Sequence, residues 1–146
     1  MLHLDWYRCK GAIWCDLFKV NLENPIIKKA NGLYIIWTGN YTERNMLKVG
    51  NGKIYAEFAT AKNELAIQAF SHLGVFCTWT EVSSLKMRKV ENFLINKLSP
   101  KLNGGGVKGG FIEVNLPWDN EQDYRSADDA DYDDDDDDFF TAIFGE

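Results

Sequence analysis

An uninterrupted apolar run in the first third of the chain constrains the fold more than any other feature. Gly32 opens the run, and the residues from Leu33 to Trp37 are apolar at odd and even positions alike. Since side chains alternate between the two faces of a strand, such a run is typical of a central strand that is covered on both sides. The chain therefore needs a sheet with packed layers on both faces. At 146 residues, it is long enough for one such core and too short for two ordinary domains.

Other segments predict the strands that flank this one. They combine β-branched and aromatic residues with turn signals at their ends. The predicted strands lie at 46–49, 75–82 and 111–116, with an edge strand inside 12–20. The strand at 46–49 follows a short polar connector, so it is expected to pair antiparallel with the central one.

Two helices are predicted from periodicity. Apolar residues recur at helical spacing from Lys53 to about Leu73, which indicates an amphipathic helix. A second helix begins at Ser83 or Ser84 and runs to about Ser99, where the following proline ends it. We expect an α+β fold in which helices flank a small antiparallel three-stranded sheet.

Charge divides the chain into two unequal parts. From Asp119 to the end, 13 acidic residues face one basic residue, Arg125, which gives a net charge of −12. The remaining 15 basic and 9 acidic residues give residues 1–118 a net charge of +6. We expect a folded domain at 1–118 and a disordered acidic C-terminal tail at 119–146. A basic body suits a polyanion such as nucleic acid, although a solvated surface with an excess of Lys explains the same charge.

The cysteines and the apolar runs bear on location. Cys9, Cys15 and Cys77 form no C-x-x-C pair, and neither His3 nor His72 stands at zinc-ligand spacing from them. We expect buried free thiols in a reducing compartment. Charged residues interrupt the first ten positions, where a signal peptide needs an apolar stretch, and no run reaches membrane-spanning length. The expected location is cytoplasmic, with no membrane contact.

Three fragments follow one another in a fixed order. The first is Gly32-Leu33-Tyr34 and the second is Lys48-Val49-Gly50. The third begins at Glu91, which is expected to lie on a helix, and has the pattern E-x-x-L-I-x-x-L-x-P-x-x-N, which ends at Asn103. Together they resemble the GIY-YIG nuclease family, whose motifs are G-[IL]-Y, [YK]-[IV]-G and a helical Glu before P-x-x-N. The resemblance covers residues 32–103. It implies a GIY-YIG-like fold, metal-dependent hydrolysis of phosphodiester bonds by an endonuclease, and DNA as the partner.

Glu91 carries the most chemistry in this comparison. On a helix, Leu98, Met87 and Ile95 all lie within about 40° of it, so its carboxylate is expected to project from the middle of the apolar stripe. Such a carboxylate needs a cation, hydrogen-bond donors or a proton. The resemblance implies that Glu91 is the sole protein ligand of a divalent metal, Mg²⁺ (or Mn²⁺). Pairing with a Lys or Arg at the rim is the alternative.

Two further catalytic positions follow from the resemblance. It implies that Tyr34 helps to activate the attacking water, whereas a tyrosine on a strand is commonly only a core aromatic. Lys48 stands where many members carry a second tyrosine, and some branches also carry Lys there. Chemically, Lys48 could contact a phosphate.

One family residue is replaced. The stretch from Val49 to Ile54 resembles the V-G-Q-G-x-I form of the second element. Gly50 fits the turn between the second strand and the first helix, and it is an expected phosphate-binding residue. In that form an Arg follows shortly after and clamps the scissile phosphate, but Glu57 occupies its place here. Loss of such a donor typically costs on the order of 10² to 10³ in rate, and a reversed charge costs more. Lys53 and Arg88 are the other expected phosphate-binding residues.

Two functions remain open from the sequence. The first is a GIY-YIG endonuclease-like domain with impaired catalysis, in which Tyr34, Lys48 and Glu91 act on the DNA backbone. The second is a non-catalytic module that binds nucleic acid or protein. Apolar residues follow the aspartates of the acidic tail, among them Phe139, Phe140 and Phe144, and the sequence continues to Gly145-Glu146. It could dock a protein partner, shield the basic body by mimicking DNA, or serve solubility alone.

Overall fold

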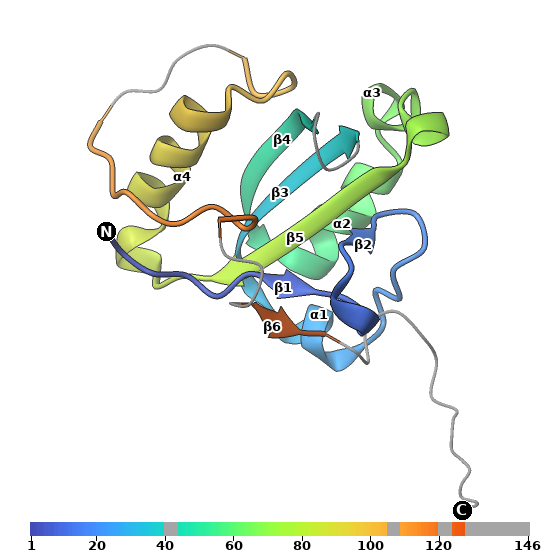
Figure 1. The fold of residues 1–146 in the computed structure, drawn as a ribbon, viewed down its shortest axis with the longest axis horizontal. Helices are drawn as coiled ribbons and strands as arrows, with labels where there is room; N and C mark the ends of the chain where they lie inside the picture. The colour runs from blue at the N-terminus through green and yellow to red at the C-terminus, as the bar shows by residue number, and fades with distance from the viewer. Residues whose placement is uncertain (40–43, 105–108, 120–123, 128–146) are drawn as a thin grey trace, which may run out of the picture.

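A four-stranded antiparallel sheet lies at the centre of the computed structural model, which describes residues 1–39, 44–104, 109–119 and 124–127 (Figure 1). The strand order is β2-β5-β3-β4, and the strands are β2 (Cys15–Asp16), β5 (Val75–Glu81), β3 (Asn31–Gly39) and β4 (Arg44–Lys53). The run that begins at Leu33 lies in β3, between β5 and β4, as its two apolar faces predict. The expected α+β class is confirmed, and β2 adds a short fourth strand at one edge.

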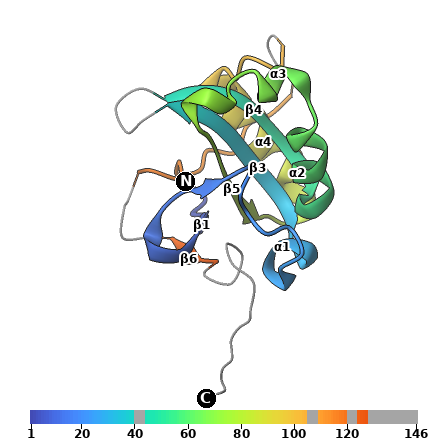
Figure 2. The same cartoon turned by 90° about the vertical axis from the view of Figure 1, so that its right-hand side faces the viewer.

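Each face of β3 borders its own hydrophobic core. Tyr34 and Ile36 project into a core that includes Phe58 of α2 (Ile54–Lys62). Leu33 and Ile35 project into a second core, with side chains of α4 (Ser84–Leu98). We call these two sides of the sheet the α2 face and the α4 face. Figure 2 shows α2 and the sheet from the side.

The first predicted helix is divided into three pieces. They are α2, the short α3 (Leu65–Gln68) and the 3-10 turn η2 (Ser71–Leu73). The break occurs because Asn63 closes α2 and Glu64 adopts an extended conformation, φ −78° and ψ 123°, which redirects the chain so that Ile67 is buried. A shorter helix, α1 (Pro25–Lys29), precedes β3, and the side chain of Asn24 caps it.

The second predicted helix is confirmed with nearly the expected bounds. It ends at Leu98, and Ser99 then takes a left-handed conformation, φ 48°, before the proline. Across the described ranges, none of the helices combines the length and the apolar composition that a membrane crossing requires.

The last predicted strand, at 111–116, is wrong. Only Val114 makes a bridge, a parallel one to Leu2. The physical reason lies one residue further on, where the amide side chain of Asn115 bonds both backbone groups of Leu4, accepting from N at 2.6 Å and donating to O at 2.9 Å. A side chain thus makes the contacts that a strand ladder would otherwise supply.

Part of the predicted acidic tail packs on the domain. Strand β6 (Arg125–Ser126) pairs parallel with β1 (Tyr7–Arg8), and Ala127 is fully buried. The expectation of disorder from Asp119 onward is therefore wrong for these residues, because β1 offers a free backbone edge and a small apolar residue follows. The rest of that expectation, at 120–123 and 128–146, lies outside the described residues.

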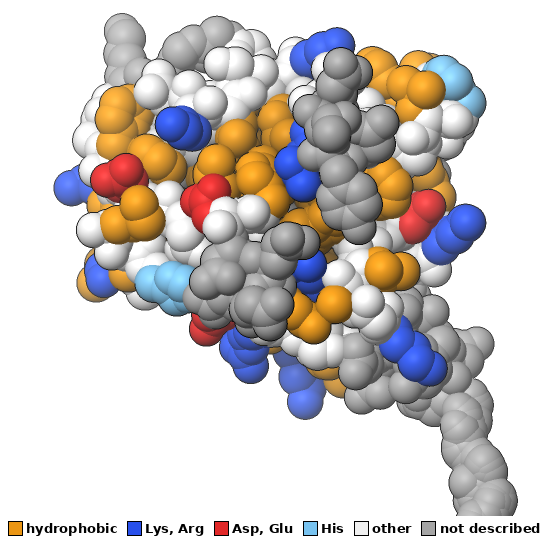
Figure 3. All heavy atoms as spheres, in the orientation of Figure 1, with side chains coloured by type: hydrophobic (Ala, Val, Ile, Leu, Met, Phe, Trp, Pro, Cys, Tyr) orange, Lys and Arg blue, Asp and Glu red, His pale blue; other side chains and the backbone are white. Residues whose placement is uncertain are grey.

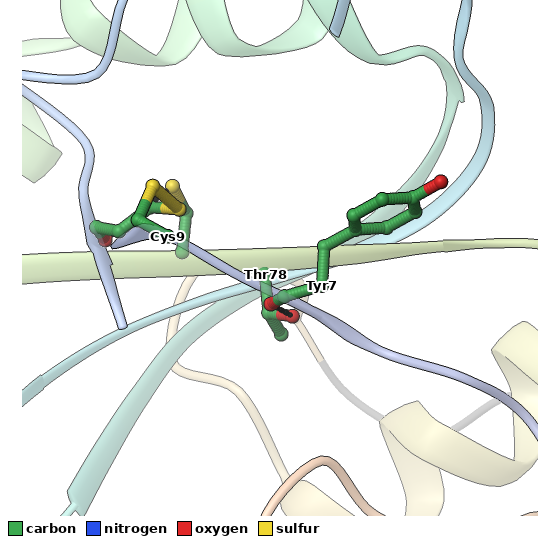
Figure 4. The surroundings of a disulfide bond; sticks show 5 residues. Tyr7, Cys9 and Thr78 are labelled. Atoms are coloured by element: carbon green, nitrogen blue, oxygen red, sulfur yellow. Dashed lines mark hydrogen bonds between the residues drawn. A yellow bond between two sulfur atoms is a disulfide. The ribbon is translucent and has the colours of Figure 1, made fainter. Parts of the chain in front are cut away.

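A disulfide joins Cys9 to Cys15, so the expectation of free thiols is wrong for these two (Figure 4). The chain reverses through the turn η1 (Lys10–Ala12), where Gly11 has φ 78°, and N of Cys9 bonds O of Ile13 at 2.8 Å. This reversal brings the two sulfurs together at a spacing that fits no familiar sequence pattern. Cys77 is free and buried, as expected. Since disulfides persist in oxidising surroundings, the cysteines no longer argue for a reducing compartment.

Candidate functional site

Tyr34 lies on the α2 face, and its ring crosses the neighbouring strand at a glycine. Gly50 of β4 is the register partner of Tyr34. A Cβ atom at Gly50 would lie 2.4 Å from the Tyr34 hydroxyl oxygen and 2.6 Å from the ring carbon that bears it. No side chain fits that space, so Gly50 is what allows Tyr34 to reach past the edge strand. The second motif therefore has a clear steric role beside the first.

The Tyr34 hydroxyl contacts Glu57, the residue that stands in the expected phosphate-clamp position. It donates a hydrogen bond of 2.8 Å to Oε1 of Glu57, in the first turn of α2. Gly52, with φ 138°, borders the same carboxylate, since a Cβ there would lie 3.4 Å from its Oε2. Two glycines of β4 thus form a slot in which the phenol and the carboxylate meet. Phe58 closes the slot with an edge-on contact, 5.6 Å between ring centroids.

Electrostatics holds the proton on Tyr34. Burial is the largest cause that raises the pKa of this phenol far above its usual value, and the hydrogen bond to Glu57 is the next. The charges of Glu57, Glu64 and Glu91 raise this pKa further. A phenol of this kind stays protonated at neutral pH and is a poor proton acceptor for an attacking water.

Lys48 lies on the same face and also meets a carboxylate. Its Nζ is 3.1 Å from Oε1 of Glu64, at the break between α2 and α3. The two side chains are 25% and 34% exposed. The pair is screened less than a fully exposed one, so Lys48 is held away from any other anion unless Glu64 moves. The structure thus gives each of two expected catalytic residues a glutamate partner that the sequence did not predict.

Glu91 lies on α4 and not in the middle of its apolar stripe. Val90 and Leu94 are fully buried and form the centre of that stripe, whereas Glu91 is partly exposed at its margin. The expectation from helical angles is wrong here because the helix is turned so that Val90, about 100° from Glu91, faces the sheet. Among the described residues, no hydrogen bond or ion pair joins the Glu91 side chain to a partner. The charge of Glu91 nevertheless acts on Tyr34, although α2 and α4 cover opposite faces of the sheet.

The remaining expected phosphate contacts are exposed and lie on different elements. Lys53 is the last residue of β4 and precedes α2, whereas Arg88 stands one turn before Glu91 on α4. Both side chains are exposed. Lys48 and Gly50 share the α2 face with Tyr34, so the structure groups these three and leaves Arg88 with Glu91 on the other helix.

Asn103, the last motif residue, connects α4 to this site through the backbone. Its side-chain oxygen accepts from N of Val49 at 2.8 Å, and its side-chain nitrogen donates to O of Val49 at 2.7 Å. Pro100 is buried and directs the chain toward β4. The third fragment of the resemblance thus fixes the second one in place, directly before Gly50.

The donor set for a metal is sparse. No group of three or more His, Cys, Asp or Glu residues able to hold an ion occurs in the part of the chain that the structure describes. The resemblance implies a different arrangement, with one protein carboxylate and the remaining positions filled by water and phosphate. The partly exposed and unpaired carboxylate of Glu91 fits that arrangement, because Mg²⁺ keeps several waters and needs few protein ligands.

Comparison with known proteins adds no family to these observations. No protein-family model, curated protein or solved structure matches the chain.

Proposed function

We propose that this chain is a GIY-YIG-like domain that contacts the nucleic-acid backbone and whose capacity for metal-dependent phosphodiester hydrolysis is impaired. The observation that carries the proposal is the 2.8 Å hydrogen bond from Tyr34 to Glu57. It combines the residue that the resemblance assigns to water activation with the residue that stands in the phosphate-clamp position.

The charge at that position argues for weak catalysis. A phosphate clamp supplies positive charge where the transition state gains negative charge. Glu57 has the opposite sign, and its carboxylate already accepts a hydrogen bond from the Tyr34 hydroxyl. A phosphate oxygen placed beside it would be repelled, and the phenol could not donate to that oxygen at the same time.

A divalent ion on Glu91 completes the hydrolytic version of this proposal. When bound, Mg²⁺ or Mn²⁺ would polarise the phosphate and stabilise the leaving oxygen. Tyr34 would orient a water through its hydroxyl, and Lys48 would neutralise phosphate charge once it is released from Glu64. The chain's own residues therefore supply positioning, while two glutamates oppose binding.

A non-catalytic nucleic-acid-binding module is the second candidate, and α4 favours it. This helix carries four exposed basic residues and a single acidic one, Glu91, for a net charge of +3. The basic residues are Lys86, Arg88, Lys89 and Lys97. A basic helix can contact phosphates without base readout or chemistry.

Nicking of supercoiled plasmid DNA in Mg²⁺ or Mn²⁺ tests the proposal. The unmodified chain is expected to nick slowly or not at all. Glu57→Arg is expected to raise nicking by about 10² to 10³, because it returns a donor to the clamp position. Glu57→Gln is the matched control, since it removes the charge but supplies no cation, and a smaller gain is expected.

The role of Glu91 separates the two candidates. Nicking by Glu57→Arg that disappears in Glu57→Arg/Glu91→Ala supports a hydrolytic site. DNA binding without nicking in every variant would favour the non-catalytic module. Rapid nicking by the unmodified chain that Glu91→Ala abolishes would overturn impairment, because another cation would then replace the clamp.

A further inference from the structure

A pocket of about 340 Å³ lies beside the disulfide, away from the residues discussed above. Its walls are the disulfide itself and four apolar side chains, and two charged residues stand at its edge. The apolar residues are Ile13, Trp14, Val20 and Phe76, and the charged ones are Asp16 and Lys19. Ligand pockets commonly measure about 300 to 1,000 Å³, so this one has room for one or two side chains. Figure 3 shows hydrophobic side chains at the surface over β2 and the adjacent end of β5, next to charged ones.

The pocket is built on a rigid frame. The disulfide closes the segment between Cys9 and Cys15, and backbone hydrogen bonds brace the turn inside it. The Arg8 guanidinium is buried and donates to O of Ala12 at 3.3 Å, while it lies 4.2 Å from the ring centroid of Trp14. A site whose walls are fixed in advance loses little entropy when it takes a ligand. Ile13 is nevertheless 57% exposed, which leaves an apolar wall open to solvent.

The end of the described chain lies next to this pocket. N of Ala127 donates to O of Arg8 at 2.7 Å, and Arg8 precedes Cys9, which lines the pocket. Twelve residue steps separate Ala127 from Phe139. A fully extended chain of that length spans at most about 40 Å, which sets the reach of these apolar residues from Ala127.

The composition of the C-terminal residues matches the pocket. Six consecutive aspartates at 133–138 precede four large apolar residues, Phe139, Phe140, Ile143 and Phe144. Lys19 lines the pocket and Lys10 follows Cys9, which also lines it; both lysines are exposed and supply positive charge for the aspartates. The Asp16 carboxylate already accepts from N of Phe18 at 2.9 Å, so part of its charge is offset locally. An apolar anchor with a charged flank is a common form of protein recognition.

We infer that the pocket formed by the disulfide, Ile13, Trp14 and Phe76 binds the apolar end of this chain's own acidic tail. One aromatic residue from Phe139–Phe144 fills the pocket, and the aspartates lie over Lys10 and Lys19. The acidic segment is thereby tied to the edge of the sheet at β2. In Figure 1, β2 lies at the opposite end of the molecule from α4, so docking leaves the basic helix uncovered.

A nitroxide placed in the tail tests this inference on the full chain. Thr141→Cys introduces a thiol for the label, whereas Cys77 is buried and its thiol is protected. The inference predicts that amide signals of Ile13, Trp14 and Lys19 lose intensity, that those of α4 keep it, and that reducing the nitroxide restores the lost signals. Equal loss at both places, or no loss, would overturn it.

Substitutions in the pocket provide the specificity control. Ile13→Glu should restore the lost signals, because it places a charge on the apolar wall. Leu85→Glu, a matched change at a site that is 92% exposed on α4, should leave them weakened. Lys19→Glu tests the charged part separately and should restore them in part. An unchanged loss in Ile13→Glu would contradict pocket binding.

A mixture of labelled and isotope-enriched chains identifies the occupant. If the enriched chain carries no label and its pocket signals still fade in the mixture, a second copy supplies the tail and the intramolecular inference is overturned. Signals that fade only when label and pocket share one chain support it. Replacement of Phe139, Phe140, Ile143 and Phe144 by Ser should remove the effect while the aspartates remain.

Discussion

The two faces of the sheet differ in whether their polar and charged side chains have partners within the protein. On the α2 face, Tyr34 and Lys48 each end on a glutamate, at 2.8 Å and 3.1 Å. On the α4 face, the covering helix is basic and exposed, and Glu91 has no side-chain partner among the described residues. The polar ends of Tyr34 and Lys48 are thus bonded to glutamates, whereas the basic side chains of α4 are exposed to solvent.

This difference shows which side of the domain is free to bind an anion. A phosphate that approaches the α2 face must displace a glutamate from either Tyr34 or Lys48. At α4, a phosphate meets basic side chains in water, where contact releases counterions. The face that carries Tyr34 and Lys48 is therefore the less suited to a phosphate, and the face covered by α4 is the more suited.

The largest stability effect is expected from a substitution that fills the slot between Tyr34 and Gly50 on the α2 face. Gly50→Ala should lower the free energy of unfolding by about 3 kcal/mol, because the new methyl group overlaps the Tyr34 ring and hydroxyl. Gly110→Ala, beside α4, is the matched control: its Cβ would lie 3.5 Å from the flexible Lys89 side chain. We expect a change near zero there. Urea denaturation measures both, and similar losses would contradict the tight approach at Gly50.

The Tyr34–Glu57 hydrogen bond should be worth somewhat less. Tyr34→Phe leaves a partly buried carboxylate without its donor and should cost about 1 to 2 kcal/mol. Tyr55→Phe is the matched control, because it removes an exposed hydrogen bond of 3.1 Å to Glu23 and should cost less. Urea denaturation at pH 7 compares the two. Equal costs would show that burial of the Tyr34 pair has no effect on its strength.

The same substitution should change stability at alkaline pH. The folded pKa of Tyr34 is raised above the ordinary value of 10.0, chiefly by burial and then by Glu57. The folded state therefore holds the proton more tightly than the unfolded state, and this contribution is present below pH 10 and is lost as pH rises above it. Tyr34→Phe should make the alkaline decline shallower. Tyr7, whose pKa burial also raises, should keep a residual decline in both proteins.

The smallest effect is expected on the α4 face. If α4 contacts phosphates, Lys86→Ala and Arg88→Ala should each reduce the slope of log affinity against log salt by about 1. Lys29→Ala, an exposed change on α1 near the α2 face, should leave the slope unchanged. Titration of duplex DNA at several salt concentrations measures the slopes. Equal effects at all three positions would remove the distinction between the faces.

Much of the fold could be predicted because its signals are local. The two apolar faces of the Leu33 run, the helix that ends before Pro100 and the strand at 75–82 each depend on patterns a few residues long. The helix break at Glu64 could not be predicted, because it places Ile67 in a core whose members come from many parts of the chain. The bonds of Asn115 to Leu4 likewise join residues far apart in the chain.

The sequence predicted which residues form the candidate site but not which of them bond one another. Spacing placed Tyr34, Gly50 and Glu57 on neighbouring elements, yet no local pattern says that the phenol bonds the glutamate. The signal that could have indicated it is the pair Gly50 and Gly52, since glycines opposite a strand tyrosine and before a helix leave room for such a contact. The disulfide was missed because pairing depends on the turn at Gly11, which spacing alone does not reveal.

The bonds around Asn103 have a consequence for self-association. An open strand at the margin of a sheet can template pairing with another chain. Here N of Lys101 and N of Leu102 bond the backbone of β4 at 3.0 Å and 2.8 Å, and the Asn103 amide bonds both groups of Val49. At the other margin, β2 is only two residues long. The segment after α4 therefore covers this edge of the sheet and limits its pairing with another molecule. A substitution such as Asn103→Ala should expose the edge of β4 to such pairing while the domain remains folded.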